Sequence, residues 1–130
     1  MMQEDRDLGA FHYVDELRIF DSESLEFIKP KINGLAPAAR AYHGFNLVGD
    51  KIITFGGWRG ASPIGLKTIN YLETRTLAWE SSEATGEAPP GVLYGHAVVS
   101  VGASLVCFGG WDGRNATNNT YILDCASLFQ

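Results

Sequence analysis

Three histidines are the side chains of this sequence best suited to metal binding or proton transfer: His12, His43 and His96. Imidazole titrates near neutral pH and is a common metal ligand. His43 and His96, however, stand at equivalent positions of two similar stretches, and equivalent positions in a repeat lie one structural unit apart. We therefore expect both to pack on the first strand of their own unit. His12 has no second ligand near it in the sequence.

Motifs that would support catalysis are missing from the sequence. It contains no His-Glu-x-x-His, Cys-x-x-Cys or Gly-x-Ser-x-Gly pattern, which are signatures of zinc sites and of nucleophilic serine. We expect no catalytic residue, no bound metal and no cofactor.

An internal repeat is the main feature of the elements that carry these residues. The apolar run Lys51–Phe55 precedes Gly56 and Gly57, and Ser104–Phe108 precedes Gly109 and Gly110 in the same way. Four residues recur 53 positions later: Pro37 as Pro90, His43 as His96, Gly56 as Gly109, and Trp58 as Trp111. A period near 50 residues is typical of β-propellers with four-stranded blades. We interpret the double glycines as structural, because a backbone without Cβ lets a neighbouring aromatic ring approach, and we expect Trp79 to be such a ring.

A second pattern of strand, polar turn and strand occurs at residues 20–27, 72–79 and 123–130. It divides the chain into a flexible tail (1–11), the C-terminal half of a blade (12–30), a first full repeat (31–82) and a second repeat truncated in its last strand (83–130). The predicted strands are 16–20, 25–29, 40–48, 51–55, 67–73, 77–81, 94–101, 104–108 and 119–124, with one more beginning at Leu128.

Two strands carry apolar residues on consecutive positions, so both of their faces should be covered. We expect stacked blades to bury six side chains: Ile52, Ile53, Phe55, Leu105, Val106 and Phe108. The two cysteines, Cys107 and Cys125, are predicted to be free buried thiols.

The composition excludes some classes of partner. Ten Lys and Arg against 15 Asp and Glu give a formal charge of -5, which disfavours nucleic acid and anionic membranes as partners. No stretch approaches the length of a membrane helix and the first residues lack the pattern of a secretory signal, so we expect a cytoplasmic protein.

In these residues the chain resembles the kelch repeat family. The resemblance rests on residues 37–43, 52–58 and 72–79, on their counterparts at 95–96, 105–113 and 121–124, and on residues 15–21. It departs from the family at Leu93, which stands where the first repeat has Arg40, and at Gln130, which stands where Trp79 predicts a tryptophan. The resemblance implies an all-β fold, a kelch-type propeller segment of four-stranded antiparallel blades that is too short to close alone.

The resemblance also implies a binding face. Kelch propellers grip partner proteins with the loops between strands and between blades, which on this chain would place Trp58, Arg59, Trp111, Asp112 and Arg114 in one aromatic and charged cluster. The alternative is that both tryptophans pack on their own blade and that the charged side chains are only solvated.

Two other functions stay open at this stage. Some kelch-like propellers resemble galactose oxidase or act on sugars as epimerases, but an oxidase needs a copper site with a Tyr-Cys crosslink, and no spacing here brings such residues together. The missing blades also predict self-association or a longer parent chain that completes the propeller, because an end blade exposes an apolar face.

Overall fold

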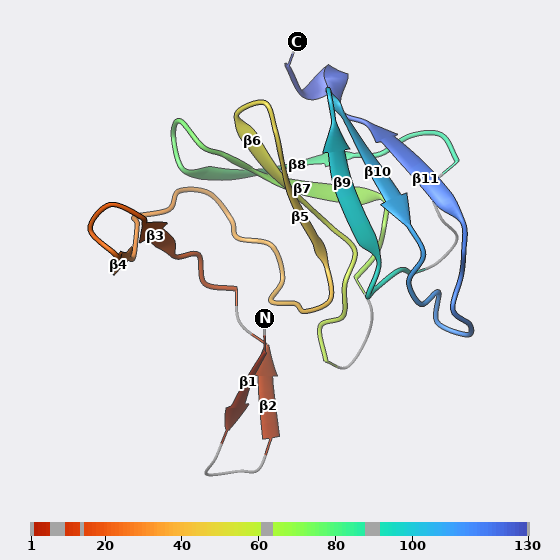
Figure 1. Ribbon diagram of the computed structural model, residues 1–130, viewed down its shortest axis with the longest axis horizontal. Coiled ribbons are helices and arrows are strands. Elements are labelled where there is room, and N and C mark those ends of the chain that lie inside the picture. The colour runs from red at the N-terminus through yellow and green to blue at the C-terminus, as the bar shows by residue number, and fades with distance from the viewer. Residues whose placement is uncertain (1, 6–9, 14, 61–63, 88–91, 130) are drawn as a thin grey trace.

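Two antiparallel sheets stacked face to face form the centre of the computed structural model (Figure 1). The structure describes residues 2–5, 10–13, 15–60, 64–87 and 92–129. All sheets in it are antiparallel, and they do not close into a barrel. The predicted all-β fold, a partial propeller, is confirmed.

Blade 1 is a four-stranded sheet in which each strand pairs with the next along the chain. Its strands are β5 (Gly44–Val48), β6 (Lys51–Phe55), β7 (Thr68–Glu73) and β8 (Ala78–Glu83). A two-residue turn joins β5 to β6, and Gly49 at its first position has a φ of 59°, which glycine adopts without steric cost. The strand predicted at 51–55 is confirmed in full.

Blade 2 repeats the first three strands of this arrangement. It contains β9 (Ala97–Val101), β10 (Ser104–Phe108) and β11 (Thr120–Asp124), with β10 in the middle. The predicted strand beginning at Leu128 is wrong, because Ala126–Phe129 is a 3₁₀ helix. The Asp124 carboxylate accepts a hydrogen bond from the Ala126 amide (3.0 Å) and thereby turns the chain. The turn brings Phe129 over blade 1, 4.5 Å from the Lys51 ammonium to the ring centre.

The first strand of each blade begins later than predicted. Residues 40–43 and 94–96 were expected to be strand, but Ala41 and Tyr94 instead form single bridges to Trp58 and Trp111. The next residue has a positive φ in both repeats, 57° at Tyr42 and 68° at Gly95, which interrupts the extended backbone.

Two hairpins precede blade 1. Within residues 12–30, where half a blade is predicted, β3 (Ile19–Asp21) pairs with β4 (Glu26–Ile28) as a hairpin, and both strands are shorter than predicted. Before it, β1 (Met2–Asp5) pairs with β2 (Ala10–Tyr13), although the sequence predicted a flexible tail over residues 1–11. The strands of this hairpin pair through backbone hydrogen bonds, which any side chain permits.

The hydrophobic core lies between the two blades, where β9 packs against β5. Its buried members come from both sheets and from the loops beside them: Val48, Ile53, Phe55, Leu66, Ile69, Tyr71, Leu93, Leu105, Cys107 and Cys125. Two hydrogen bonds cross the same interface, from the Asn46 amide to the Val98 carbonyl (3.0 Å) and from the Ser100 hydroxyl to the Leu47 carbonyl (2.7 Å). Both cysteines are free and buried, as predicted, and burial raises the pKa of Cys107 to about 11.

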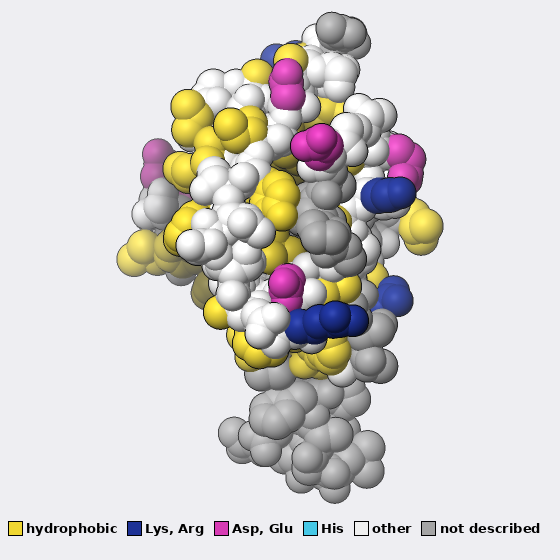
Figure 2. All heavy atoms as spheres, turned by 90° about the vertical axis from the view of Figure 1, so that its right-hand side faces the viewer, with side chains coloured by type: hydrophobic (Ala, Val, Ile, Leu, Met, Phe, Trp, Pro, Cys, Tyr) yellow, Lys and Arg dark blue, Asp and Glu magenta, His cyan; other side chains and the backbone are white. Residues whose placement is uncertain are grey.

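The outer face of blade 2 is apolar and uncovered. Of the six side chains predicted to be buried, Ile53, Phe55 and Leu105 are buried and Ile52 and Val106 are half-buried, but Phe108 is 53% exposed and its prediction is wrong. The register places Phe108 on the face that points away from blade 1. The exposed apolar side chains of this face also include Val99, Val101 and Ile122. Figure 2 shows hydrophobic side chains gathered along one side of the view.

The double glycines make room for histidines. Gly56 has a φ of 69°, and a Cβ there would lie 2.6 Å from the Leu93 carbonyl oxygen and 2.8 Å from Cε1 of His96. A Cβ at Gly57 would lie 2.9 Å from Cβ of His43, and one at Gly110 equally close to Cβ of His96. Gly56, the first glycine of its pair, therefore lies against His96 of the next blade. Gly57 and Gly110, the second glycines of the two pairs, each lie against the histidine of their own blade. Trp79, predicted for this role, is not among the atoms nearest to these glycines.

Gly109 is the counterpart of Gly56 in blade 2, and no described blade follows blade 2. The nearest atom to a Cβ built there is the Thr117 carbonyl oxygen at 3.4 Å, and no histidine ring lies beside it among the described residues. Its φ of 73° nevertheless matches that of Gly56. The backbone at Gly109 therefore has the same conformation as the backbone at Gly56, against which blade 2 packs.

Candidate functional site

The long loops of both blades lie at one end of the stacked sheets, at the bottom of Figure 1. They follow β6 and β10, and the link from β8 to β9 ends there, where Val92 pairs with Gly65 and Tyr94 pairs with Trp111. The tight turns and the 3₁₀ helix lie at the opposite end (Figure 1). We call the first of these ends the loop face.

An aromatic row crosses the loop face from blade 1 to blade 2. The rings of Trp58 and Tyr94 lie 5.3 Å apart between centres, tilted by 48°. The backbone of Tyr94 in turn pairs with that of Trp111 through two hydrogen bonds of 3.2 and 2.9 Å. Trp58 is half-buried beneath the tyrosine, whereas Trp111 is 41% exposed. The two tryptophans therefore differ, although they occupy equivalent repeat positions.

Backbone hydrogen bonds between the blades hold this row in place. The Gly57 amide donates to the Leu93 carbonyl and the Gly95 amide donates to the Tyr42 carbonyl, both at 2.9 Å. Tyr42 is 57% exposed beside them. Because these bonds join loops of different blades, the loop face has a fixed geometry rather than that of two independent loops.

The charged residues predicted for this face have different roles. Arg59 and Arg114 are exposed on the two loops. Asp112 is also exposed, but its carboxylate accepts hydrogen bonds from the amides of Arg114 (2.9 Å) and Asn115 (2.8 Å). These bonds lower the pKa of Asp112 and close the loop as an Asx turn. Asp112 thus shapes the loop that presents Arg114.

A buried arginine supports the other loop. Arg40 is 5% exposed and donates to the carbonyls of Ala38 (3.0 Å) and Gly56 (3.1 Å). Burial lowers its pKa, and the nearby charge of Arg59 adds to this effect. Buried Leu93 stands at the equivalent position of the second repeat. Hydrogen bonds from Arg40 therefore support the loop of blade 1, whereas an apolar side chain lies at this position in blade 2.

The histidines lie in the interior between the loops and the sheets. His96 packs its ring edge-on against Phe55, with 5.4 Å between the ring centres, and burial lowers its pKa. Burial also lowers the pKa of His43 to about 4, assisted by the charge of Arg40. The Nδ1 atoms of both histidines are buried without a hydrogen-bond partner in the described part of the chain. The side chain of His12 lies outside the described residues.

A groove of about 460 Å³ separates residues 15–18 from the outer face of blade 1. His43, Phe45, Thr54 and Trp79 are among the residues that line it. The Thr54 hydroxyl is buried and has no hydrogen-bond partner among the described residues.

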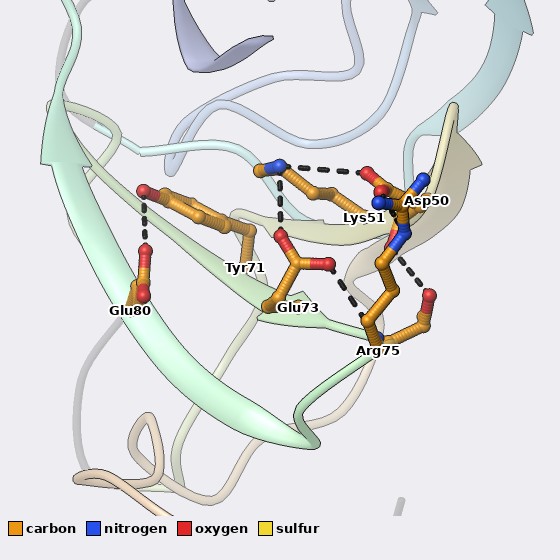
Figure 3. A network of polar contacts seen from close by, with 7 residues as sticks. Asp50, Lys51, Tyr71, Glu73, Arg75 and Glu80 are labelled. Carbon is orange, nitrogen blue, oxygen red and sulfur yellow. Dashed lines mark hydrogen bonds and ion pairs between the residues drawn. The ribbon is translucent and has the colours of Figure 1, made fainter.

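A charged network lies at the end opposite the loop face (Figure 3), and the sequence did not predict it. The Lys51 ammonium contacts Glu73 at 2.8 Å and Asp50 at 3.4 Å, and Arg75 contacts the other oxygen of Asp50 at 2.9 Å. The hydrogen bond to Glu73 raises the pKa of Lys51. These charges are paired with one another and join two hairpin turns of blade 1, so their role is structural.

Neither a metal cluster nor a membrane span is found in the described residues. They contain no group of three or more His, Cys, Asp or Glu side chains that could hold a metal ion. The helices described in this structure are also too short or too polar to cross a bilayer.

Comparison with known proteins identifies the repeat. Residues 6–128 match the KLHDC2/KLHL20/DRC7 Kelch-repeats domain. The chain belongs to the kelch-repeat family. This assignment agrees with the stacked blades, the double glycines and the half blade described above.

Several larger proteins contain a segment similar to this chain. A probable serine/threonine-protein kinase of Dictyostelium discoideum is 31% identical over 111 residues, which cover 83% of this chain and 8% of the kinase. Host cell factor of Drosophila melanogaster is 30% identical over 118 residues (80% and 8%), and human host cell factor 2 is 26% identical over 133 residues (89% and 17%). The chain therefore spans a small part of each of these relatives.

Proposed function

We propose that this kelch-repeat chain is a protein-interaction module that binds a partner protein through its loop face. Kelch-repeat domains in general bind proteins and are not enzymes, and the chain carries no catalytic motif. The observation that supports the loop face most is the contrast between its tryptophans. Trp58 is covered by Tyr94, whereas Trp111 is 41% exposed at the end of a row fixed by hydrogen bonds.

Exposed tryptophan beside arginine is the composition that protein interfaces favour at their centre. Trp111 offers a large apolar surface at little cost in conformational entropy, and Arg59 and Arg114 lie on loops at the same end. The partner is expected to be acidic where it meets the arginines, because charge complementarity steers association and fixes the orientation.

The test compares partner capture by variants of the loop face with capture by the unchanged chain. We expect Trp111→Ala and the double variant Arg59→Ala/Arg114→Ala each to reduce the recovered partner at least about tenfold in quantitative mass spectrometry, the typical effect of removing an interface anchor. Circular dichroism should show an unchanged fold.

The matched control is Arg18→Ala/Arg75→Ala, which removes two exposed arginines away from the loop face. It should leave capture unchanged. Equal capture by the loop variants and the control would overturn the proposal.

A further inference from the structure

The ring of Tyr13 lies on the loop that follows β6. Gly60 belongs to this loop and has a φ of 100°, and a Cβ built on it would lie 2.8 Å from Cε2 and 3.0 Å from Cδ2 of Tyr13. The ring therefore packs directly on bare backbone. Tyr13 is the last residue of β2, and Figure 1 shows the β1–β2 hairpin beside the loop end of the blades. The chain thus covers part of its own loop face.

The second repeat has the same backbone conformation without such a ring. Gly113 stands 53 positions after Gly60, which is the period of the repeat, and has a φ of 101°. The nearest atom to a Cβ built there is Cγ2 of Val92 at 3.1 Å, and no aromatic ring of the described residues lies within 4 Å. A bare glycine is therefore a feature of both loops, whereas the ring that lies on one of them comes from a segment outside the two repeats.

The charges beside the two glycines differ. Arg59 precedes Gly60, whereas Asp112 precedes Gly113. Arg59 is exposed. Burial, and then the charge of Arg59, lower the pKa of Arg40, so two guanidinium groups make this part of the loop face positive. An acidic ligand therefore complements the loop at Gly60.

The residues that follow the ring are acidic. Asp15 and Glu16 are both exposed, and they line the same groove of blade 1 as Arg40. Glu16 is also paired with Arg18 and Lys29, at 3.0 and 3.1 Å. An aromatic ring followed by carboxylates is therefore the pattern that lies on this part of the loop face.

The hairpin that carries the ring can be displaced. A two-stranded hairpin is at best marginally stable in water by itself. Among the described strands, β1 and β2 pair only with each other. No blade has to open when a competing segment takes the place of Tyr13.

We propose that Tyr13 is an internal ligand of the loop face and that a partner protein displaces it with an aromatic side chain followed by acidic residues. This role rests on the loop-face function proposed above, and it defines both the residue type that the partner inserts and a competitor within the chain. While Tyr13 covers Gly60, the affinity for the partner is reduced in proportion to the fraction of molecules whose site is free.

A labelled peptide with the sequence of residues 10–16 tests the competition, because it carries the aromatic and acidic residues of the internal ligand. Fluorescence anisotropy compares its binding to the unchanged chain and to variants at Tyr13. We expect Tyr13→Ala to bind the peptide at least about fivefold more tightly, because its site is free. Tyr13→Phe keeps the ring and should bind the peptide as weakly as the unchanged chain does.

Changes in the peptide test the type of residue that the site takes. Binding to the Tyr13→Ala chain should weaken at least about tenfold when the Tyr of the peptide is replaced by Ser, because the anchor is lost. It should also weaken when the Asp and Glu of the peptide are replaced by Asn and Gln, because the charge complementarity is lost. Equal binding of the unchanged and altered peptides would overturn the aromatic and acidic pattern.

Two glycine variants locate the site. In the Tyr13→Ala background, Gly60→Ala places a Cβ where the ring packs, whereas Gly113→Ala adds the same Cβ to a backbone of nearly the same φ. We expect Gly60→Ala to weaken peptide binding at least about tenfold and Gly113→Ala to leave it unchanged. Circular dichroism checks that each variant is folded.

The results separate this proposal from the loop-face function. Equal peptide binding by the unchanged chain and Tyr13→Ala would overturn the internal ligand, and equal binding by the two glycine variants would overturn the site at Gly60. Either result leaves the loop-face function standing if partner capture depends on Trp111. Partner capture that does not depend on Trp111 would overturn the loop-face function, whatever the peptide shows.

Discussion

At the level of single residues, the double glycine allows the two blades to pack closely against each other. Gly56→Ala should destabilise the protein by about 2 to 5 kcal/mol, because the new Cβ combines a left-handed backbone with a collision against a carbonyl oxygen. The backbone φ is 69° and the Leu93 oxygen would be 2.6 Å away. Urea denaturation measures the change in the free energy of unfolding.

Gly86→Ala is the matched control for this substitution. Gly86 has a φ of 83°, and nothing lies within 4 Å of a Cβ built there, so only the backbone term of about 1 to 2 kcal/mol remains. If both variants lost the same stability, the close approach of blade 2 to Gly56 would not be a determinant of the fold.

The buried histidines predict acid sensitivity. Their pKa is lowered in the folded protein, to about 4 for His43, below the value of about 6.5 expected in the unfolded chain. The unfolded state therefore binds more protons between these values, so stability is complete above about pH 6.5 and falls as the pH drops toward 4. Because His43 is only half-buried, we expect a loss of about 1 to 2 kcal/mol from this residue.

Urea denaturation at a series of pH values tests the origin of this loss. His43→Phe should flatten the fall in stability between pH 6.5 and pH 4.5 compared with the unchanged chain. An unchanged slope in the variant would show that carboxylates, rather than His43, cause the acid sensitivity.

At the level of elements, the contact between β5 and β9 decides how the two blades hold together. Ser100→Ala removes the hydroxyl that donates to the Leu47 carbonyl at 2.7 Å and should lower the free energy of unfolding by about 0.5 to 1.5 kcal/mol. Ser81→Ala changes an exposed serine of β8 and should stay within about 0.5 kcal/mol. The urea midpoint at constant slope measures both, and a smaller effect for Ser100 than for Ser81 would contradict this role.

At the level of the whole molecule, the open face of blade 2 predicts association. Val99, Phe108 and Ile122 are each more than half exposed on one face, and such apolar patches promote contact between molecules. Sedimentation of the purified chain should show a mass that rises with concentration. Val99→Lys/Ile122→Lys should shift it to the monomer, whereas Asn118→Lys, in an exposed loop, should not. A monomer at all concentrations would remove this prediction.

The sequence by itself determined the repeat, the strands 51–55 and 104–108, and the family. These features are encoded locally, in apolar runs, glycine positions and a fixed spacing, so they can be recognised without knowing what lies beside them. The position of the loop-face residues was predicted from the resemblance to the kelch family.

Only the tertiary structure decided which partner each local feature has. Gly56 receives His96 and not Trp79, Phe108 faces outward because no described blade follows it, and Tyr94 covers one of two equivalent tryptophans. The tertiary structure also places Phe129, after the turn at Ala126–Phe129, against Lys51 of blade 1. Burial and ring contacts depend on residues distant in the sequence, and a repeat specifies the same local structure whether or not a neighbouring blade is present.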